Sequence, residues 1–326
     1  MTLTSTLLHL TNFRTPILRT LVPAVGAAFV IQAAVAIPSV WLQSERFYDL
    51  SGSLTYLGVV GGSLVGGWMR ERGVGKGGTG VEWPQLLDAF TGKGGPNALN
   101  WRQVVLSAAV GIWATRLGSY LFARILSDGH DSRFDEIKKS PAKFFGAFAA
   151  QATWVSLCCM PVLALNSLPS SLLATLPTLM LTDILGLLLF TSGLGFEIMA
   201  DRQKSAWVAA KKRKEHDEDF LTSSLWGKSR HPNYFGESTL WMGVAVVSAG
   251  VLTGKVGQVG MGTVGWGVWG KVLGVGLAGV SPAFVTFLLL KVSGVPLSEG
   301  KYDKKYGHRK DYQEWKKNTP MFIPKL

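Results

Sequence analysis

Residues 172–199 read LLATLPTLMLTDILGLLLFTSGLGFEIM, and residues 200–214 continue as ADRQKSAWVAAKKRK. The first stretch is long enough to cross a membrane as a helix, which takes about 20 mostly apolar residues. The second stretch contains six lysines and arginines. An apolar segment followed by a basic one is typical of a transmembrane helix that ends on the cytoplasmic side. This part of the chain therefore predicts an integral membrane protein.

The composition of the whole chain agrees with that prediction. Of 326 residues, 47% are hydrophobic and only 17% are charged, whereas soluble domains have about 25% charged residues. The chain also has 39 glycines and 12 tryptophans, residues that are frequent in membrane helices and at membrane interfaces respectively. The composition excludes a disordered chain, a collagen and a disulfide scaffold. The only cysteines, Cys158 and Cys159, are adjacent, and we expect them to be small buried side chains.

Apolar segments of similar length recur along the chain and predict an all-α, polytopic bundle of transmembrane helices. We expect about seven spans, give or take one or two, because segment boundaries are uncertain by several residues. The expected spans are Ile17–Leu42, Leu50–Met69, Val104–Leu126, Phe144–Leu165, Leu172–Met199, Phe235–Leu252 and Val264–Leu290.

The net charge of +12 is distributed as expected for a membrane protein. Lysines and arginines are concentrated in the third and fifth connections and in the tail after Lys291, while the fourth connection has none. We therefore expect these three basic segments in the cytoplasm. Because the basic residues flank apolar spans, the sequence favours the bilayer as a partner and argues against nucleic acid. The remaining positive charge could bind an anionic ligand on the cytoplasmic side.

Glycine motifs near the C-terminus resemble a dinucleotide fingerprint only in their letters. Residues 254–279 contain three GxGxxG matches, but their surroundings are apolar and no acidic residue occurs between Glu237 and Glu299. A dinucleotide fingerprint needs a preceding strand and a later acidic residue for the ribose. We interpret these glycines as helix-packing residues or a turn between spans, and Gly58, Gly62 and Gly66 as packing residues.

Ionisable residues within the spans are candidates for function because the bilayer makes them costly. The following side chains are in or next to an expected span: Arg116, Tyr120, Asp183, Glu197, Asp201 and Glu237. One interpretation is an internal ion pair, for example between Arg116 and Asp183. We prefer a water-filled polar pocket that faces the cytoplasm, because so many of these groups lie at a similar depth in the membrane.

The densest polar cluster is residues 228–237, KSRHPNYFGE. Pro232 disfavours helix at His231, so we expect a turn that leads directly into the sixth span. The start of a helix favours anions, and this turn adds cations, an imidazole, an amide and a phenol. The cluster fits a phosphate-bearing cofactor, and it fits a purely interfacial loop equally well.

Several separated stretches of the chain, in a shared order, resemble the steroid 5α-reductase superfamily, in particular its branch of uncharacterised membrane proteins. The stretches are Phe47–Tyr56, Trp113–Gly118, Gly129–Asp135, Gly195–Lys204, Arg230–Glu237, Ser293–Glu299 and Phe322–Pro324. The resemblance implies that residues 1–46 form an N-terminal segment that contains the first span. Residues 47–326 would then form a reductase-like membrane domain with cytoplasmic loops and tail.

The resemblance implies an NADPH-dependent reductase of a carbon–carbon double bond in a lipid-like or steroid-like substrate. It implies a cofactor site at matching positions in the C-terminal half and the third span. These positions are Arg116, Tyr120, Glu197, Asp201, Lys204, Asn233, Tyr234 and Glu237. By their chemistry, Lys204, Arg230 and His231 can pair with phosphate, and Asp201, Asn233 and Glu237 can hydrogen-bond a ribose or a carboxamide.

For the proton donor in such a reaction we select Tyr120, or Asp49 with Tyr56. We expect no metal. If the source is eukaryotic, we expect a multi-pass protein of the endoplasmic reticulum.

Two other functions remain open from the sequence. Isoprenylcysteine and phospholipid methyltransferases, which use S-adenosylmethionine, resemble the same C-terminal half, but they end the last span with a Glu-Glu pair where this chain has Ser298-Glu299. The third interpretation is a membrane protein that binds a lipid without turning it over.

Overall fold

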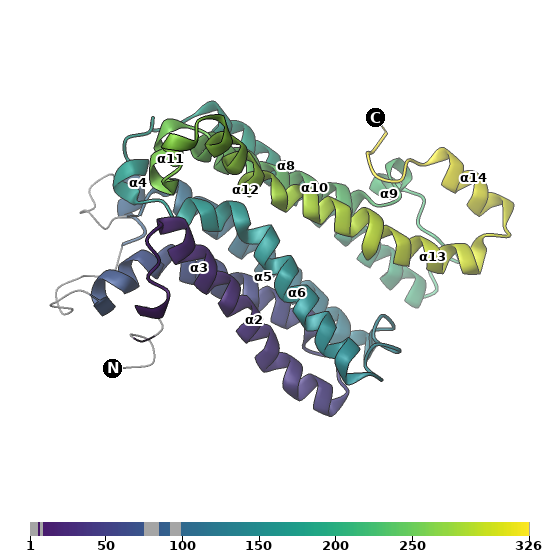
Figure 1. Cartoon of the computed structure of the whole chain (residues 1–326). Helices are drawn as coiled ribbons and strands as arrows, with labels where there is room; N and C mark the ends of the chain where they lie inside the picture. The colour runs from purple at the N-terminus through teal and green to yellow at the C-terminus, as the bar shows by residue number, and fades with distance from the viewer. Residues whose placement is uncertain (1–5, 7–8, 75–84, 92–98, 326) are drawn as a thin grey trace. The chain divides into compact units, whose positions relative to one another are not determined.

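The computed structural model describes the chain except residues 1–5, 7–8, 75–84, 92–98 and 326 (Figure 1). Within the described residues there is no β-strand, which confirms the predicted all-α architecture. The α-helices are α2 (Pro16–Leu42), α3 (Tyr48–Val74), α4 (Asp88–Thr91), α5 (Trp101–Asp128), α6 (Pro141–Asn166), α7 (Ser170–Leu173), α8 (Leu181–Lys212), α9 (Ser224–Lys228), α10 (Pro232–Leu252), α11 (Lys255–Met261), α12 (Val268–Phe287), α13 (Val295–Tyr306) and α14 (Lys310–Asn318). A 3₁₀ turn, η1 (Val264–Trp266), and a π-helical turn, η2 (Leu288–Val292), complete the set.

Six helical segments of the described residues are long and apolar enough to cross a membrane. They are α2, α5, α6, α8, α10 and the continuous run Val268–Tyr306. The second expected span is part of α3, which is a continuous helix of 27 residues. It is not among the six, because it contains many Gly and Ser residues, which are less apolar. The chain is therefore a multi-pass membrane protein.

The fifth expected span differs from the helix that forms there. Residues 174–180 are turns and bends, and α8 begins only at Leu181. Pro177 explains the break, because the residue before a proline is driven out of the helical region. At its other end α8 continues past the apolar part to Lys212, so that its last three turns are polar and basic. This extension positions Lys204 and Trp207 for the site described below.

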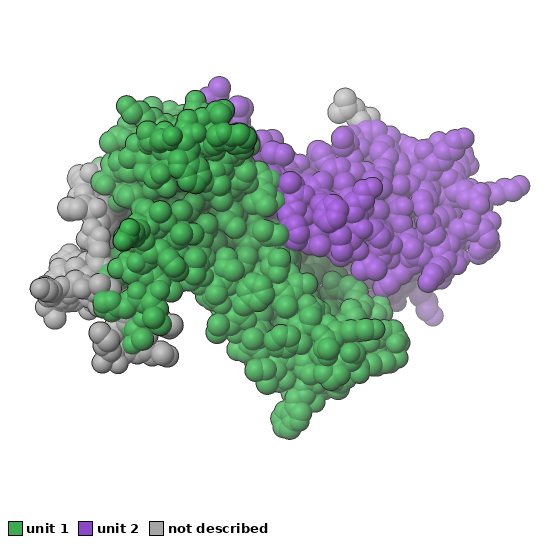
Figure 2. Space-filling model, in the orientation of Figure 1, with its two compact units in different colours: residues 1–180, 248–280 green, residues 181–247, 281–326 purple. Residues whose placement is uncertain are grey.

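The chain forms two compact units (Figure 2). Both α10 and α12 contribute residues to each of them. Unit 1 contains residues 1–180 and 248–280. Unit 2 contains residues 181–247 and 281–326.

Unit 1 is built on a bundle of α2, α3, α5 and α6. At one end its aromatic core includes Tyr48, Phe134, Phe144 and Phe148. Deeper in the bundle, Gln32 of α2 donates to Thr55 of α3 over 2.7 Å. Ser51 links this pair to Gln151 of α6 through contacts of 3.3 Å with both amide oxygens. Hydrogen bonds of this kind help membrane helices to associate, because lipid offers polar groups no other partner.

The glycine-rich stretch of unit 1, residues 254–279, consists of α11, the turn η1 and the first part of α12. The sequence predicted packing glycines or a turn here, and a turn is present. A dinucleotide fingerprint would need a strand before its glycines, and helix α11 occupies that place. Gly262 ends α11 at φ 73° and Gly267 has φ 56° before α12, a backbone region that favours glycine. Three glycines of α3 were expected to pack against another helix. A Cβ added to Gly58 would lie 3.2 Å from Ile31 Cδ1, so Gly58 is at a packing contact. A Cβ added to Gly62 or Gly66 would have no described neighbour within 4 Å, so these two glycines are not.

Unit 2 is organised by a close, glycine-lined contact between α8 and α10. A Cβ added to Gly193 would be 2.5 Å from Leu240 N and 2.7 Å from Gly236 O. One added to Gly236 would be 2.6 Å from Glu197 N. Two turns away, Gly186 and Gly243 make the matching contact. Small residues let helix backbones approach closely in a bilayer, and here they hold the apolar part of α8 against α10.

Candidate functional site

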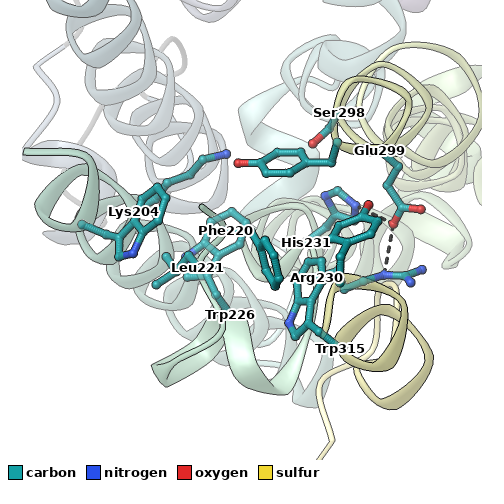
Figure 3. Close-up of a pocket in the computed structure, with 12 residues that line it drawn as sticks. Lys204, Phe220, Leu221, Trp226, Arg230, His231, Ser298, Glu299 and Trp315 are labelled. Carbon is teal, nitrogen blue, oxygen red and sulfur yellow. Dashed lines mark hydrogen bonds and ion pairs between the residues drawn. The ribbon is translucent and has the colours of Figure 1, made fainter. Parts of the chain in front are cut away.

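A pocket with a cavity volume of about 40 Å³ lies in unit 2. Its walls come from the polar end of α8, the connection to α9, α9 itself, the turn before α10, and helices α13 and α14. Figure 3 draws the lining side chains. The lining residues are Lys204, Trp207, Phe220, Leu221, Trp226, Arg230, His231, Ser298, Glu299, Tyr302, Tyr312 and Trp315.

The turn before α10 is held in place by the last residues of the chain. The backbone N–H of Arg230 donates to Pro320 O at 2.9 Å, and that of Lys325 donates to Lys228 O at 3.0 Å. The hydroxyl of Ser229 donates to Phe322 O at 2.9 Å. These bonds satisfy backbone groups that the turn cannot satisfy within a helix. The C-terminal segment thus holds the turn that lines the pocket.

The charged side of the pocket is organised around Glu299 of α13. Its Oε1 is 3.1 Å from Arg230 Nε and 3.2 Å from His231 Nε2, and its Oε2 is 3.2 Å from Lys316 Nζ. Only 18% of the Glu299 side chain is exposed, with 12% for Arg230 and 6% for His231. Figure 3 draws the contacts of Glu299 with Arg230 and His231 as dashed lines. Ion pairs with this little exposure are screened less by water than surface pairs.

His231 is neutral at pH 7. Burial lowers its pKa below the ordinary 6.5, and the nearby charges of Lys204 and Arg230 lower it further, against the opposing effect of Glu299. A carboxylate can only accept, so the neutral imidazole donates its Nε2 proton to Glu299. The ring also stacks on Tyr234, with centroids 5.2 Å apart and planes 3° apart.

The rest of the pocket is aromatic. Phe220, Tyr306 and Tyr312 form a buried cluster, with Tyr302 and Trp315 packed against it. On another wall, Lys204 Nζ lies 4.8 Å from the ring centroid of Trp226, within the range of a cation–π contact. In Figure 3, Lys204 stands on one side of the view and Arg230 with Glu299 on the other, with Phe220 between them.

Three of the residues predicted for the cofactor, Lys204, Arg230 and His231, line this pocket. Asn233 and Tyr234 follow in the first turn of α10, which starts at Pro232 as the expected turn required. The other three predicted residues of unit 2 are buried on α8 and α10. They are Glu197, Asp201 and Glu237, with 3%, 8% and 9% exposure.

The other four predicted residues belong to unit 1. Asp49, near the start of α3, has Arg133 Nη2 at 3.0 Å and Arg124 Nη2 at 3.8 Å. Tyr56 is 1% exposed and packs against the edges of tryptophan rings. Arg116 and Tyr120 lie one turn apart on α5, and both are partly buried. The ion pairs of Asp49 provide a structural role for it, and the selection of these residues as a proton donor stays a prediction.

Sequence reasoning did not select Glu299 or the aromatic residues as parts of a site. Most of them are in the charged tail after Lys291, which we interpreted as a cytoplasmic segment. A signal was present, because Tyr302 and Tyr306 are spaced i, i+4 and Tyr312 and Trp315 i, i+3. Such spacing places each pair on one face of a helix, which is unexpected in a solvated tail.

The chemistry of the lining favours an anionic ligand with flat rings. Lys204 and Arg230 contribute two positive charges, Glu299 contributes one negative charge, and His231 is neutral. Aromatic walls suit the stacking of a base or another flat group. Over the part of the chain that the structure describes, no group of three or more His, Cys, Asp or Glu side chains could hold a metal ion.

Comparison with known proteins gives one match. No curated protein and no solved structure matches the chain. A family model described as "Protein of unknown function (DUF1295)" matches residues 85–319. The match covers most of the chain and includes every residue that lines the pocket. The chain therefore belongs to the DUF1295 family of uncharacterised membrane proteins.

Proposed function

We propose that this protein is a membrane-embedded, NADPH-dependent reductase of a carbon–carbon double bond in a lipid-like or steroid-like substrate. One observation carries the proposal: the pocket of unit 2 combines the cations Lys204 and Arg230 with aromatic walls. Phosphate groups need cations or N–H donors, and flat heterocycles need aromatic or apolar surfaces. A dinucleotide has both kinds of group.

The charges of the lining residues are compatible with NADPH. The one carboxylate among the described lining residues, Glu299, already contacts Arg230, His231 and Lys316. It therefore adds little repulsion toward an anion. Lys204 and Arg230 would hold phosphate, and His231 would join them through Nδ1 when its ring is protonated. Asn233, Asp201 and Glu237 would hold ribose or carboxamide. Tyr234 and the buried Glu197 would complete the part of the site that belongs to unit 2. Arg116 of unit 1, which the resemblance also implies, stays a prediction.

When bound, NADPH supplies a hydride, which is the difficult part of the chemistry. The chain's task is to orient the substrate and to supply a proton. Tyr120 is our first candidate for the proton donor, and Asp49 with Tyr56 is the second. Each can be tested by substitution with Phe or Asn, which should abolish turnover without abolishing NADPH binding.

The alternative with a structural argument is a methyltransferase that uses S-adenosylmethionine. The aromatic walls could surround its positively charged sulfonium group. The net positive charge of the lining argues against a sulfonium ligand. The one carboxylate of the lining, Glu299, could attract such a cation, but it is already paired with Arg230 and Lys316. A third alternative is a protein that binds a lipid without turnover.

Ligand-dependent thermal stability of the purified protein in detergent separates these functions. A ligand that binds only the folded form stabilises it by about 2.7 kcal/mol at 100 times its Kd. We expect NADPH to raise Tm, NADH to do so less, and S-adenosylmethionine to have no effect. Stabilisation by S-adenosylmethionine alone would overturn the reductase proposal, and no response to any of the three would favour a lipid-binding protein.

The matched variants are Lys204→Gln and Lys212→Gln, both on α8. Lys204 lines the pocket and Lys212 does not. We expect only Lys204→Gln to reduce the stabilisation by NADPH. Turnover is then tested by following NADPH oxidation with enone lipids. In a eukaryotic cell we expect the protein in the endoplasmic reticulum, which microscopy of a tagged full-length chain can test.

A further inference from the structure

Glu299 occupies an unusual position for a carboxylate in a site proposed to bind an anion. It lines the pocket, yet it would repel a phosphate group if it were free. Its two oxygens instead contact three side chains from two other parts of unit 2, the turn before α10 and helix α14. The arrangement raises the question of what Glu299 contributes to the pocket.

Arg230 is held at two ends of its guanidinium group. Its Nε lies 3.1 Å from Glu299 Oε1, and its Nη1 donates to the backbone oxygen of Lys316 at 2.8 Å. Nη2 has no hydrogen-bond partner among the residues that the structure describes. A guanidinium group presents its donors in a rigid plane. The hydrogen bond of Nη1 and the ion pair between Nε and Glu299 therefore together determine where Nη2 points.

His231 is restrained on three sides. Its backbone N–H donates to Ser229 Oγ at 3.2 Å, its Nε2 contacts Glu299 at 3.2 Å, and its ring stacks on Tyr234. Only the contact with Glu299 determines which ring nitrogen carries the proton. With that proton on Nε2, the imidazole can offer only Nδ1 to a ligand, as an acceptor or, when protonated, as a donor.

We propose that Glu299 is a positioning residue, which fixes the Arg230 guanidinium so that it can bind a phosphate group of the ligand and which holds the His231 imidazole beside it in one tautomer. This inference deepens the proposed function and rests on the same pocket. It assigns Glu299 no contact with the ligand. The negative charge of Glu299 weakens the attraction for an anion, but the fixed orientation of the Arg230 donors outweighs this loss, because ligand groups gain affinity when their partners are preorganised.

Asp303 provides a matched control for the charge of Glu299. It lies one turn later on the same helix, and it also pairs with Lys316, over 2.6 Å. It does not line the pocket and it is 45% exposed. Asp303→Asn therefore removes the same charge from α13 and leaves the contacts of Arg230 and His231 in place.

The experiment compares Glu299→Gln, Glu299→Ala and Asp303→Asn with the parent protein, full length and in detergent. The probes are NADPH and inorganic pyrophosphate, each titrated by calorimetry. We expect Glu299→Gln to weaken the binding of both by about ten- to hundredfold, the range for one hydrogen bond to a charged group. Asp303→Asn should change either affinity by no more than about twofold, as for an exposed ion pair.

A second measurement detects positioning without any ligand. NMR of the histidine rings gives the pKa of His231, which contact with Glu299 raises. In Glu299→Gln this pKa should fall further, whereas in Asp303→Asn it should stay the same. A purely structural role of Glu299, as a tie between α13 and the turn, would lower Tm in the Glu299 variants but would leave the affinity of the folded protein for pyrophosphate unchanged.

The outcomes distinguish the inference from the proposed function. If the parent binds NADPH and Glu299→Gln binds it as well as Asp303→Asn does, the positioning role is refuted and the reductase proposal stands. If the parent binds pyrophosphate but not NADPH, and Glu299→Gln loses pyrophosphate, the positioning role stands and NADPH is refuted as the cofactor. Tighter anion binding in Glu299→Gln would show that charge, and not orientation, is the effect of Glu299. Binding of neither probe would refute both.

Discussion

Replacing Gly193 by alanine should separate the two helices that organise unit 2. The added Cβ would be 2.5 Å from Leu240 N, 2.7 Å from Gly236 O and 3.0 Å from Leu240 Cα. All three atoms belong to backbone, so no side chain can rotate away to make room. Ordinary contact begins at 3.4 Å, and relief therefore requires the helix axes to separate locally by about 1 Å.

The energetic cost can be isolated with a second variant on the same helix. Gly195 is exposed in unit 2, and no described atom lies within 4 Å of a Cβ added there. Both substitutions gain about 1 kcal/mol of helix propensity, because glycine is a poor helix former. Only Gly193→Ala overpacks the contact, at a cost of about 1–3 kcal/mol. The difference between the two variants is therefore the cost of overpacking alone.

Thermal unfolding in detergent at one fixed scan rate measures this difference. We expect Gly193→Ala to melt below Gly195→Ala by an amount on the order of 5 °C. The shift of α8 should also displace Glu197, whose backbone N contacts the facing glycine of α10, and weaken stabilisation by NADPH. Equal melting temperatures for the two variants would refute the claim that α8 and α10 touch through their backbones.

Three further predictions follow from other contacts. Phe322→Ala should lower Tm by a few degrees and reduce the response to NADPH, because its ring packs on Phe235 and its backbone holds the turn at the pocket; Ile323→Ala, at a side chain 68% exposed, should do neither. Asp131 is partly buried, which alone would raise its pKa, but hydrogen bonds and charge from Arg133 hold the pKa below 3.8; the stability that it contributes is complete above pH 3.8 and is lost as the pH falls through the lower value. Asp131→Asn should therefore lower Tm at pH 7, and its Tm should fall less steeply than that of the parent protein below pH 4. Equal slopes of Tm against pH in the two proteins would contradict this. Finally, the affinity for NADPH should fall as salt rises, because the lining has a net positive charge; an affinity independent of salt would mean that stacking alone holds the ligand.

The membrane architecture could be predicted because its signal is local. The expected spans from Ile17 to Leu42 and from Phe144 to Leu165 agree with α2 and α6 to within a few residues. The errors occurred where local chemistry competed with hydropathy. Pro177 delays the start of α8, and the charged residues after Met199 continue a helix that hydropathy alone would have ended.

The site could be predicted only in part, since its residues are far apart in the chain. The cluster at residues 228–237 and Lys204 stood out from their own neighbours, and Lys204, Arg230 and His231 do line one pocket. Glu299, 68 residues beyond His231, has no local feature that marks it as their partner. The same holds for the aromatic residues of the tail, whose charged surroundings resemble a solvated segment.

The glycines show the same division most clearly. By itself the sequence determined that this is an all-α membrane protein with a basic, polar C-terminal region, because burial in lipid depends on the apolar character of each segment alone. It also excluded a dinucleotide fingerprint in residues 254–279, since apolar helices surround those glycines. Only the tertiary structure decided that Gly193 and Gly236 make the close contact, and that Glu299 meets Arg230 and His231. The physical reason is that packing and ion pairing depend on which helix faces which, and that is a property of the whole fold.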